Sequence, residues 1–199
     1  MRIPLHTHHA LISMLFLMVS AGPVVAGWTL DPSRSHLTYV TIKAKDVGEV
    51  NVFEEMSGSI GDDGQVEISM ALDSVETLVP IRNERMRELL FQTADYKDAV
   101  LTAKVDPSII DNMAPGQIEE IAAEGVLSLH GQQQPMVVQV QAARLDDGTV
   151  MVASVKPLIV DAGKFGLSDG VEKLREIAGL DSISHAVPVS FVLVFTAGE

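Results

Sequence analysis

Hydrophobic and polar residues alternate along much of the chain, and this alternation is the period of a β-strand with one buried face. In VEISMALD, at 66–73, every second residue is a large apolar one. This stretch follows GDDG at 61–64, a strong turn signal, so 49–60 and 66–73 are predicted to form a hairpin. The same β-rich pattern recurs at 35–45, 99–105, 136–145, 149–160 and 186–195.

The stretch 118–131 is ambiguous, because its first half suits a helix by propensity and its second half a strand. We predict a strand for the second half, which brings the total to about eight. Several strands, including the last, are apolar on both faces, so part of the outer surface of the sheet needs cover. Two short helices, predicted at 80–90 and 171–178, supply that cover.

Short strands, tight turns and few helices favour an all-β fold, either a sandwich or a closed barrel. Periodicity does not choose between them. A barrel of about eight strands has just enough interior for packed side chains or for one small ligand.

The N-terminal segment has the layout of a secretory signal. Arg2 provides a basic start, the apolar run at 10–21 is too short to span a bilayer, and VVA ends at Ala26. We expect a cleaved signal peptide over 1–26 and one exported, periplasmic domain over 27–199; a short membrane anchor is the alternative. No other stretch is long and apolar enough to cross a membrane, so the domain is not expected to be membrane-embedded.

The composition and the motifs of the chain exclude several classes of function. Asp and Glu number 27 against 14 Lys and Arg, a net charge of −13, which disfavours binding to nucleic acid. The absence of cysteine excludes disulfides, thiolate chemistry and cysteine-based zinc sites. His36, His130 and His185 lack metal-ligand spacing, and no G-x-S-x-G or phosphate-loop motif occurs. No catalytic residue, metal or cofactor is therefore expected.

The helix predicted at 80–90 has Pro80 in its first turn, where a missing N–H costs nothing. Met86, Leu89 and Leu90 share one face by their spacing. That face is predicted to pack against the sheet.

The same helix carries three arginines. Arg85 can pair with Glu88, and Arg87 with Glu84, each three positions apart. Arg82 has no such acid and is predicted to be the most available of the three. It is either solvated, or paired to an acid from a distant strand, or, with Arg85, in contact with a phosphate or other polar head group.

The large apolar side chains allow two interpretations. They form either a solid core or the wall of an apolar cavity. The side chains concerned are Tyr39, Phe53, Met56, Met86, Phe91 and Phe165.

Five pieces of the chain, in order, resemble the YceI-like polyisoprenoid-binding family of exported bacterial proteins. The first piece shares with the family an Asp-Pro followed by Ser and an aromatic residue, and the second an aromatic residue before a strand end that contains glycine. The third shares a series of Ser, Thr, Arg and Phe. The fourth shares a G-x-L-x-x-H-G…P element, and the fifth a late Phe-Gly. The pieces are WTLDPSRSHLTY (28–39), FEEMSGSI (53–60), LDSVETLVPIRNERMRELLF (72–91), GVLSLHGQQQPM (125–136) and DAGKFGLSD (161–169).

The resemblance implies a lipocalin-like antiparallel β-barrel with one or two short covering helices around an elongated apolar cavity. It implies a periplasmic, non-catalytic carrier or binder of a long isoprenoid or similar lipid, and it favours a strand ending at a turn with His130 beside Gly131. The predicted ligand contacts are Tyr39, Phe53, Arg82, Arg85, Met86, Phe91 and Phe165.

Four positions depart from the family pattern. Arg34 and Arg85 stand where the family often has histidine, Val52 stands where it has glycine, and Asn83 stands where it has aspartate. These changes are expected to add positive charge and remove one acid near the cavity mouth, and they leave the identity of the head group open.

Three functions follow as hypotheses. The first is a carrier or store whose lumen holds an isoprenoid, quinone or fatty-acyl chain. The second is a filled barrel that acts through its acidic surface as a stress-related interaction partner. The third is an enzyme that uses scattered residues such as His130 and Arg82. The sequence leaves the oligomeric state open, with a homodimer as one option.

Overall fold

The computed structural model describes residues 27–198, so the predicted signal peptide lies outside the described residues. The strands are β1 (Trp28–Leu30), β2 (His36–Lys43), β3 (Val47–Phe53), β4 (Met56–Ile60), β5 (Gln65–Ala71), β6 (Val75–Glu76), β7 (Asp98–Lys104), β8 (Ile118–Leu129), β9 (Gln132–Asp146), β10 (Thr149–Ser154), β11 (Leu158–Asp161) and β12 (Ala186–Ala197). The helices are η1 (Leu72–Ser74), α1 (Pro80–Arg85), η2 (Met86–Phe91), α2 (Pro107–Asp111), η3 (Ala162–Phe165) and α3 (Ser168–Ile177).

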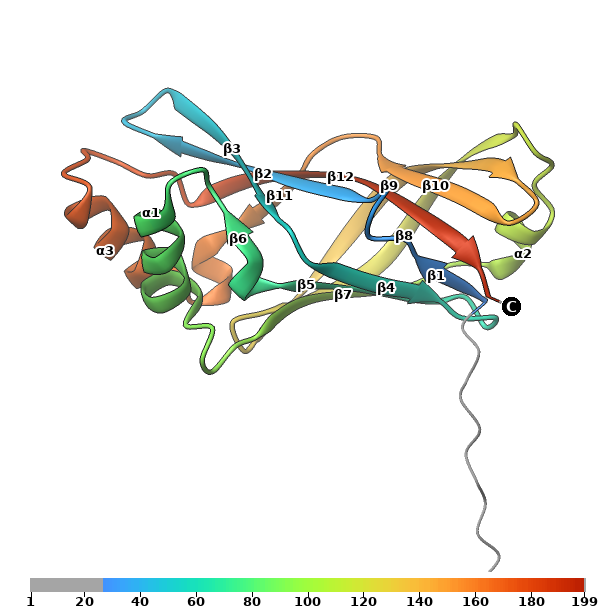
Figure 1. Cartoon of the computed structure of the whole chain (residues 1–199), viewed down its shortest axis with the longest axis horizontal. Coiled ribbons are helices and arrows are strands. Elements are labelled where there is room, and N and C mark those ends of the chain that lie inside the picture. Colours follow the sequence, from blue (N-terminus) through green and yellow to red (C-terminus); the bar gives the residue numbers. More distant parts are fainter. Residues whose placement is uncertain (1–26, 199) are drawn as a thin grey trace, which may run out of the picture.

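The strands form a closed antiparallel barrel (Figure 1). Their hydrogen-bonded order runs β1-β4-β5-β7-β8-β9-β10-β12, and β12 also pairs with β1, so these eight strands close a ring. The predicted barrel of about eight strands is therefore confirmed, and the sandwich alternative is wrong.

Beyond the ring, the barrel wall is extended by strands that pair with the first half of β12. Val189–Val192 of β12 pair with β2, and Ala186–Val189 pair with β11. The segments 49–60 and 149–160, each predicted as one strand, are interrupted and form β3 with β4, and β10 with β11. The hairpin of β2 and β3 projects past the ring towards the helices (Figure 1).

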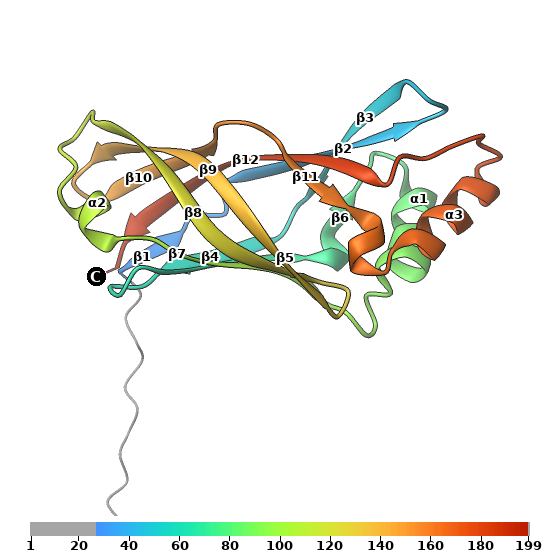
Figure 2. The same ribbon diagram turned by 180° about the vertical axis from the view of Figure 1, so that it is seen from behind.

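The hairpin of β8 and β9 crosses the back of the barrel (Figure 2). Its ladder runs from Ile118 opposite Ala143 to Leu129 opposite Gln132, so the whole of 118–129 is strand. Cross-strand pairing has overridden the helical propensity of the first half. His130 and Gly131 form a two-residue turn in which both residues have positive φ, 50° and 72°, as such hairpin turns require.

The helix predicted at 80–90 begins at Pro80 and continues past α1 as the π-helix η2, which ends at Phe91. A π-helix has more residues per turn than an α-helix, so side chains at i, i+4 and i+5 share a face. Met86, Leu90 and Phe91 are buried as a result, and Leu89 is only half-buried. The predicted face was correct for Met86 and Leu90 and wrong for Leu89.

The helix predicted at 171–178 is α3, which begins earlier, at Ser168. It packs against η2 at one end of the barrel (Figures 1 and 2). A Cβ on Gly170 would lie 2.8 Å from the Leu89 oxygen, so glycine permits this close approach. The expectation that the helices cover the outer face of the sheet is wrong, because α1 and α3 lie beside one end of the barrel and α2 lies at the other (Figures 1 and 2).

Among the described residues, none of the helices has both the length and the apolar character needed to cross a membrane.

Candidate ligand-binding cavity

The barrel encloses a cavity of about 430 Å³. This volume falls within the range of about 300–1,000 Å³ that small-molecule sites usually have. Its wall is built from the inner faces of the strands and from α1, η2 and α3. The interior is therefore hollow, and the alternative of a filled barrel does not describe this molecule.

The inner face of β2 changes from apolar to charged along its length. Alternate residues point inward, and those that line the cavity are Leu37, Tyr39, Thr41 and Lys43 in that order. The apolar residues lie nearer the closed ring, and Lys43 lies at the end of the strand towards the helices.

The inner face of β3 shows the same gradient. Phe53, Asn51 and Glu49 line the cavity, with Asn51 opposite Tyr39 and Glu49 opposite Thr41. Asn51 is buried and donates from Nδ2 to Thr41 Oγ1 at 3.1 Å. The two strands together place polar side chains at one end of an otherwise apolar lining.

Three aromatic rings lie where the lining changes from apolar to polar. Tyr39 stacks on Phe53 with ring centroids 5.3 Å apart, and Phe53 meets Phe91 at 5.8 Å in a tilted arrangement. The Tyr39 hydroxyl lies 4.0 Å from the sulfur of Met86. Burial raises the pKa of the Tyr39 hydroxyl above its ordinary value, so this group stays neutral.

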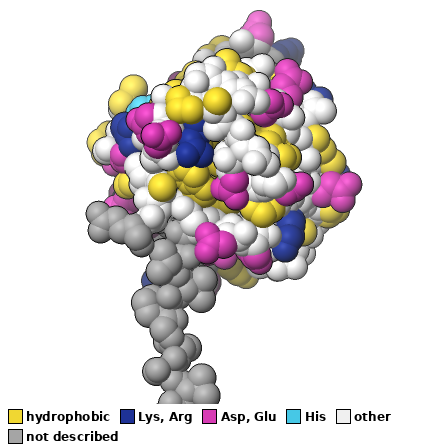
Figure 3. Space-filling view, turned by 90° about the vertical axis from the view of Figure 1, so that its right-hand side faces the viewer, with side chains coloured by type: hydrophobic (Ala, Val, Ile, Leu, Met, Phe, Trp, Pro, Cys, Tyr) yellow, Lys and Arg dark blue, Asp and Glu magenta, His cyan; other side chains and the backbone are white. Residues whose placement is uncertain are grey.

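The end of the cavity away from α1 and α3 is closed. Ile110 of α2 and Phe195 of β12 line it there and are 3% and 2% exposed. Arg144 links the segments at this end. Its guanidinium lies 4.9 Å from the Trp28 ring centre. It also donates hydrogen bonds to the backbone oxygens of Ile110, at 3.2 Å, and Asp146, at 2.8 Å. Acidic and apolar side chains are mixed over the surface at this end (Figure 3).

The helical end is open to solvent. Val79 and Ile81 both line the cavity and are 40% and 51% exposed, and Leu78 beside them is 88% exposed. Side chains that contact both the cavity and the solvent define the mouth.

An ion-pair network crosses the mouth. Glu49 accepts from Lys43 Nζ at 2.7 Å through one carboxylate oxygen, and its other oxygen accepts from Arg82 Nη1 at 2.5 Å. The hydrogen bond from Lys43, together with the charge of Arg82, lowers the pKa of the Glu49 carboxyl below its ordinary value. Glu49 is therefore ionised at neutral pH and shared by two cations.

Arg82 is held by the protein itself. Beyond its pair with Glu49, its Nε donates to Thr77 Oγ1 at 2.8 Å and its Nη2 donates to Thr77 O at 2.7 Å. Of the interpretations drawn from the sequence, pairing to an acid from a distant strand is correct. The prediction that Arg82 is the most available arginine is wrong.

Asn83 links the loop after β6 to α1. Its buried Oδ1 accepts from the backbone N of Thr77 at 2.9 Å and from the Thr77 hydroxyl at 2.6 Å. Its Nδ2 donates to Glu76 Oε2 at 2.9 Å, and this bond is the main cause that lowers the pKa of the Glu76 carboxyl. Asn83 therefore positions the loop that holds Arg82.

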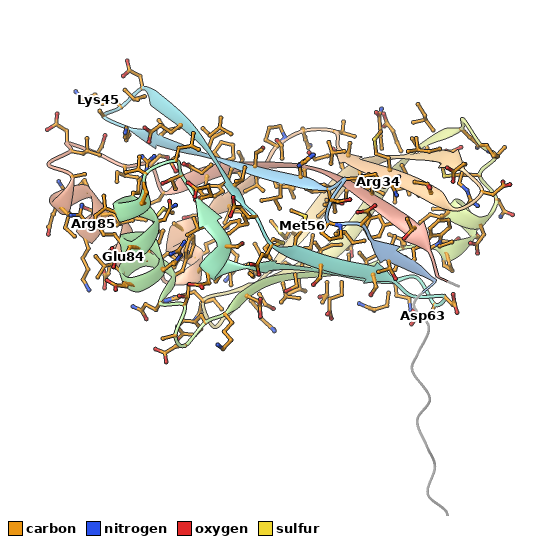
Figure 4. The ribbon with its side chains drawn as sticks, viewed as in Figure 1. Arg34, Lys45, Met56, Asp63, Glu84 and Arg85 are labelled. Atoms are coloured by element: carbon orange, nitrogen blue, oxygen red, sulfur yellow. The ribbon has the colours of Figure 1, made fainter. Side chains whose placement is uncertain are left out.

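Arg85 is half-buried and lines the cavity at the mouth (Figure 4). Within residues 27–198 its side chain forms no ion pair and no hydrogen bond. The predicted pairs of Arg85 with Glu88 and of Arg87 with Glu84 are absent. Arg87 instead donates from Nε to the backbone oxygen of Asp73 at 2.7 Å.

The predicted ligand contacts fall into two groups. Phe165 is 2% exposed, and its side chain does not line the cavity. The other predicted contacts line the cavity, and they are Tyr39, Phe53, Arg82, Arg85, Met86 and Phe91.

His130 is part of the turn between β8 and β9. Its ring lies 4.3 Å from that of Tyr96, and its Nδ1 lies 3.3 Å from Phe165 O. Its side chain does not line the cavity, so His130 and Arg82 do not share the site that the enzyme hypothesis requires. No cluster of three or more His, Asp or Glu suited to a metal ion occurs in 27–198.

The polar lining residues of β2 and β3 were not predicted from the sequence, and they are Thr41, Lys43, Glu49 and Asn51. Counting in steps of two along the strands from Tyr39 and from Phe53 reaches all of them, so the signal was present. The sequence identifies the lining residues of α3 less well, because packing against η2 decides which side of that helix faces the cavity.

Of the four departures from the family pattern, only Arg85 lines the cavity. Arg34 lies between β1 and β2 and pairs with Asp31 at 2.7 Å, and Val52 points away from the interior. The expectation that Arg34 adds charge at the mouth is therefore wrong (Figure 4).

A family model for the YceI-like domain matches residues 28–195. A polyisoprenoid-binding domain from Saccharophagus degradans, implicated in plant cell wall breakdown, is 35% identical, with a TM-score of 0.85 over 86% of this chain and 99% of that one. No curated protein matches the chain.

Two more distant structures share the fold. BcnA of Burkholderia cenocepacia is 18% identical, with a TM-score of 0.65 over 83% of this chain and 98% of that one. A YceI protein of Campylobacter jejuni is 15% identical, with a TM-score of 0.54 over 75% and 85%.

Proposed function

Because the chain belongs to the YceI-like domain family, we propose that it binds a long apolar ligand inside the barrel and acts as its carrier or store. The ligand is of polyisoprenoid, quinone or fatty-acyl type, and the protein works in the periplasm after export by its N-terminal segment. The family and the polyisoprenoid-binding neighbour support a binding protein rather than a catalyst.

One observation carries this proposal: the cavity lining is apolar except at the mouth. Burial of a hydrocarbon tail is favoured by about 25 cal/mol per Å², or about 0.8 kcal/mol for each methylene, before the costs of association. A tail inside the barrel and a polar head beside Glu49 and Lys43 match the gradient along β2 and β3.

Analysis of the purified protein tests the proposal directly. The protein is isolated from the periplasm, and native mass spectrometry and lipid extraction are used to identify what co-purifies. We expect a bound lipid with a long hydrocarbon chain. Repeated recovery of empty protein that takes up no prenyl or acyl compound would contradict the proposal.

The dependence of affinity on tail length tests whether the cavity itself holds the ligand. For delipidated protein and a series of straight-chain alcohols, we expect affinity to rise about fourfold with each methylene, the equivalent of about 0.8 kcal/mol. The rise ends when the cavity is full.

A variant with a shorter cavity should end that rise earlier. Ala142 lies on β9, is fully buried and lines the cavity, so Ala142→Phe places a ring in the space for the tail. Val137→Phe is the matched control, because Val137 on the same strand is 61% exposed. The same limiting tail length in both variants would show that the ligand binds elsewhere.

A further inference from the structure

We propose that the mouth of the cavity selects ligands with an anionic head group, a carboxylate or a phosphate, and that Arg85 is the residue that contacts it. This inference rests on the proposed function, which supplies the tail inside the barrel. It adds the chemical class of the head and the side chain that recognises it.

The first support is the charge of the lining. Its charged residues are Lys43, Glu49, Arg82 and Arg85, three cations and one carboxylate, which leaves two positive charges in excess. The whole chain carries a net charge of −13, so the positive balance of the lining is opposite to that of the protein. All four residues lie at the mouth, where a polar head would rest.

The second support is that only one of these cations is unpaired. Lys43 and Arg82 share Glu49, and the remaining contacts of the Arg82 guanidinium go to Thr77. An anion at Arg82 would have to displace these bonds. Arg85 has no partner of this kind in the described part of the chain, so its donors are available to a ligand.

The third support is the position of Arg85 on its helix. Arg85 lies three residues after Arg82 and both side chains line the cavity, so the two share the face of α1 that points to it. Glu84 and Glu88 are exposed. The arginine therefore points towards the ligand space and away from the acids of its own helix.

The chemistry of the side chain sets the class of head group. A guanidinium presents a planar fork of donors that matches the paired oxygens of a carboxylate or phosphate. Because Arg85 is half-buried, its charge is screened less than that of a fully exposed arginine. A neutral head offers no charge to this group, and a cationic head is repelled by it.

Four ligands with the same tail test the inference: palmitate, hexadecyl phosphate, hexadecanol and hexadecylamine. Each is titrated into delipidated protein by displacement of a fluorescent fatty acid analogue. We expect the two anionic ligands to bind about tenfold more tightly than hexadecanol, the size of one charge-assisted hydrogen bond at a partly exposed site. The amine should bind more weakly than hexadecanol.

Variants then assign the effect to one residue. Arg85→Gln should remove the anionic advantage, so that the two anionic ligands and hexadecanol bind this variant with similar affinity, and Arg85→Lys should keep part of the advantage. Arg87→Gln is the matched control: it lowers the charge of the same helix equally, but Arg87 does not line the cavity. This control should retain the full advantage.

The outcomes separate this inference from the proposed function. If hexadecanol binds but the anions gain nothing over it, or if Arg85→Gln keeps their advantage, the inference is overturned and the carrier function stands. If no ligand of any head group binds, the carrier function itself fails. The ratio of palmitate to hexadecyl phosphate affinity identifies which anion the mouth prefers. Should Arg85→Gln fold poorly in thermal melts, the wild-type ligand series and Arg85→Lys still decide the question.

Discussion

The two ends of the barrel hold their inward side chains by different forces. At the closed end, Ile110 and Phe195 are buried in apolar contacts, and Arg144 donates to backbone carbonyls that do not titrate. At the open end, Glu49 and Arg82 form an ion pair with side chains that are 30% and 28% exposed. The closed end is therefore expected to dominate stability, and the open end to respond to pH and to substitution of single charges.

Side-chain truncation at both ends gives the largest expected difference. Phe195→Ala should lower the free energy of unfolding by about 3–5 kcal/mol, because it removes a buried ring and leaves a space beside the cavity. Ile81→Ala, at the half-exposed rim, should cost less than about 1 kcal/mol. Urea denaturation followed by circular dichroism measures both values.

A cost at Ile81 equal to that at Phe195 would show that the rim is packed as tightly as the closed end, and the contrast between the ends would then be lost. The denaturant slope should stay unchanged in both variants, which confirms that the same amount of surface unfolds.

The substitution Asn83→Asp is expected to have the next largest effect on the free energy of unfolding. It replaces the Nδ2 donor to Glu76 with a second carboxylate in a buried position, at a cost of about 1–3 kcal/mol at pH 7. Close carboxylates raise the pKa of one of them in the folded state, so the folded protein binds more protons than the unfolded chain. The deficit should therefore shrink as the pH falls below that raised pKa.

Stability curves of this variant and the wild type between pH 8 and pH 4 measure the effect. A deficit that stays constant over that range would mean that Asn83 acts through its shape rather than through its bond to Glu76. Glu76→Gln combined with Asn83→Asp should relieve the deficit at pH 7, because one of the two carboxylates is gone.

Much of the fold followed from the sequence, since strand alternation and turn signals are local. The hairpin around 61–64 is of this kind, whereas the turn at His130 with Gly131 was expected only from the resemblance to the family. The face of η2 was partly missed, because a π-helix leaves no local signal in the sequence. The place of α3 at one end of the barrel was missed, because it depends on the contact of this helix with η2.

The candidate site shows where sequence reasoning stops. Pairing by spacing along the helix left Arg82 free and gave Arg85 a partner, and the structure has the reverse arrangement. The partner of Arg82 is Glu49, which lies on β3 and reaches the helix only when the barrel has formed. Ion pairs between distant segments depend on tertiary structure, so a single sequence does not reveal which cation stays free.

The smallest expected effect tests the ion pairs of the mouth. Glu49→Gln should lower the free energy of unfolding by about 0.5–1 kcal/mol at pH 7, because the pairs with Lys43 and Arg82 are partly exposed to solvent. The pKa of Glu49 is lower in the folded protein than the value of about 4.3 expected in the unfolded chain. Its contribution is therefore complete above pH 4.3 and is lost as the pH falls through the lower folded pKa.

Chemical denaturation of wild type and variant from pH 7 to pH 2.5 should show two stability curves that converge at the acidic end. A double-mutant cycle with Arg82→Gln gives the coupling between Glu49 and Arg82, which should vanish at the same low pH. Curves that stay parallel to pH 2.5 would show that the Glu49 carboxylate contributes nothing through its charge. The open end would then be held, like the closed end, by contacts that do not titrate.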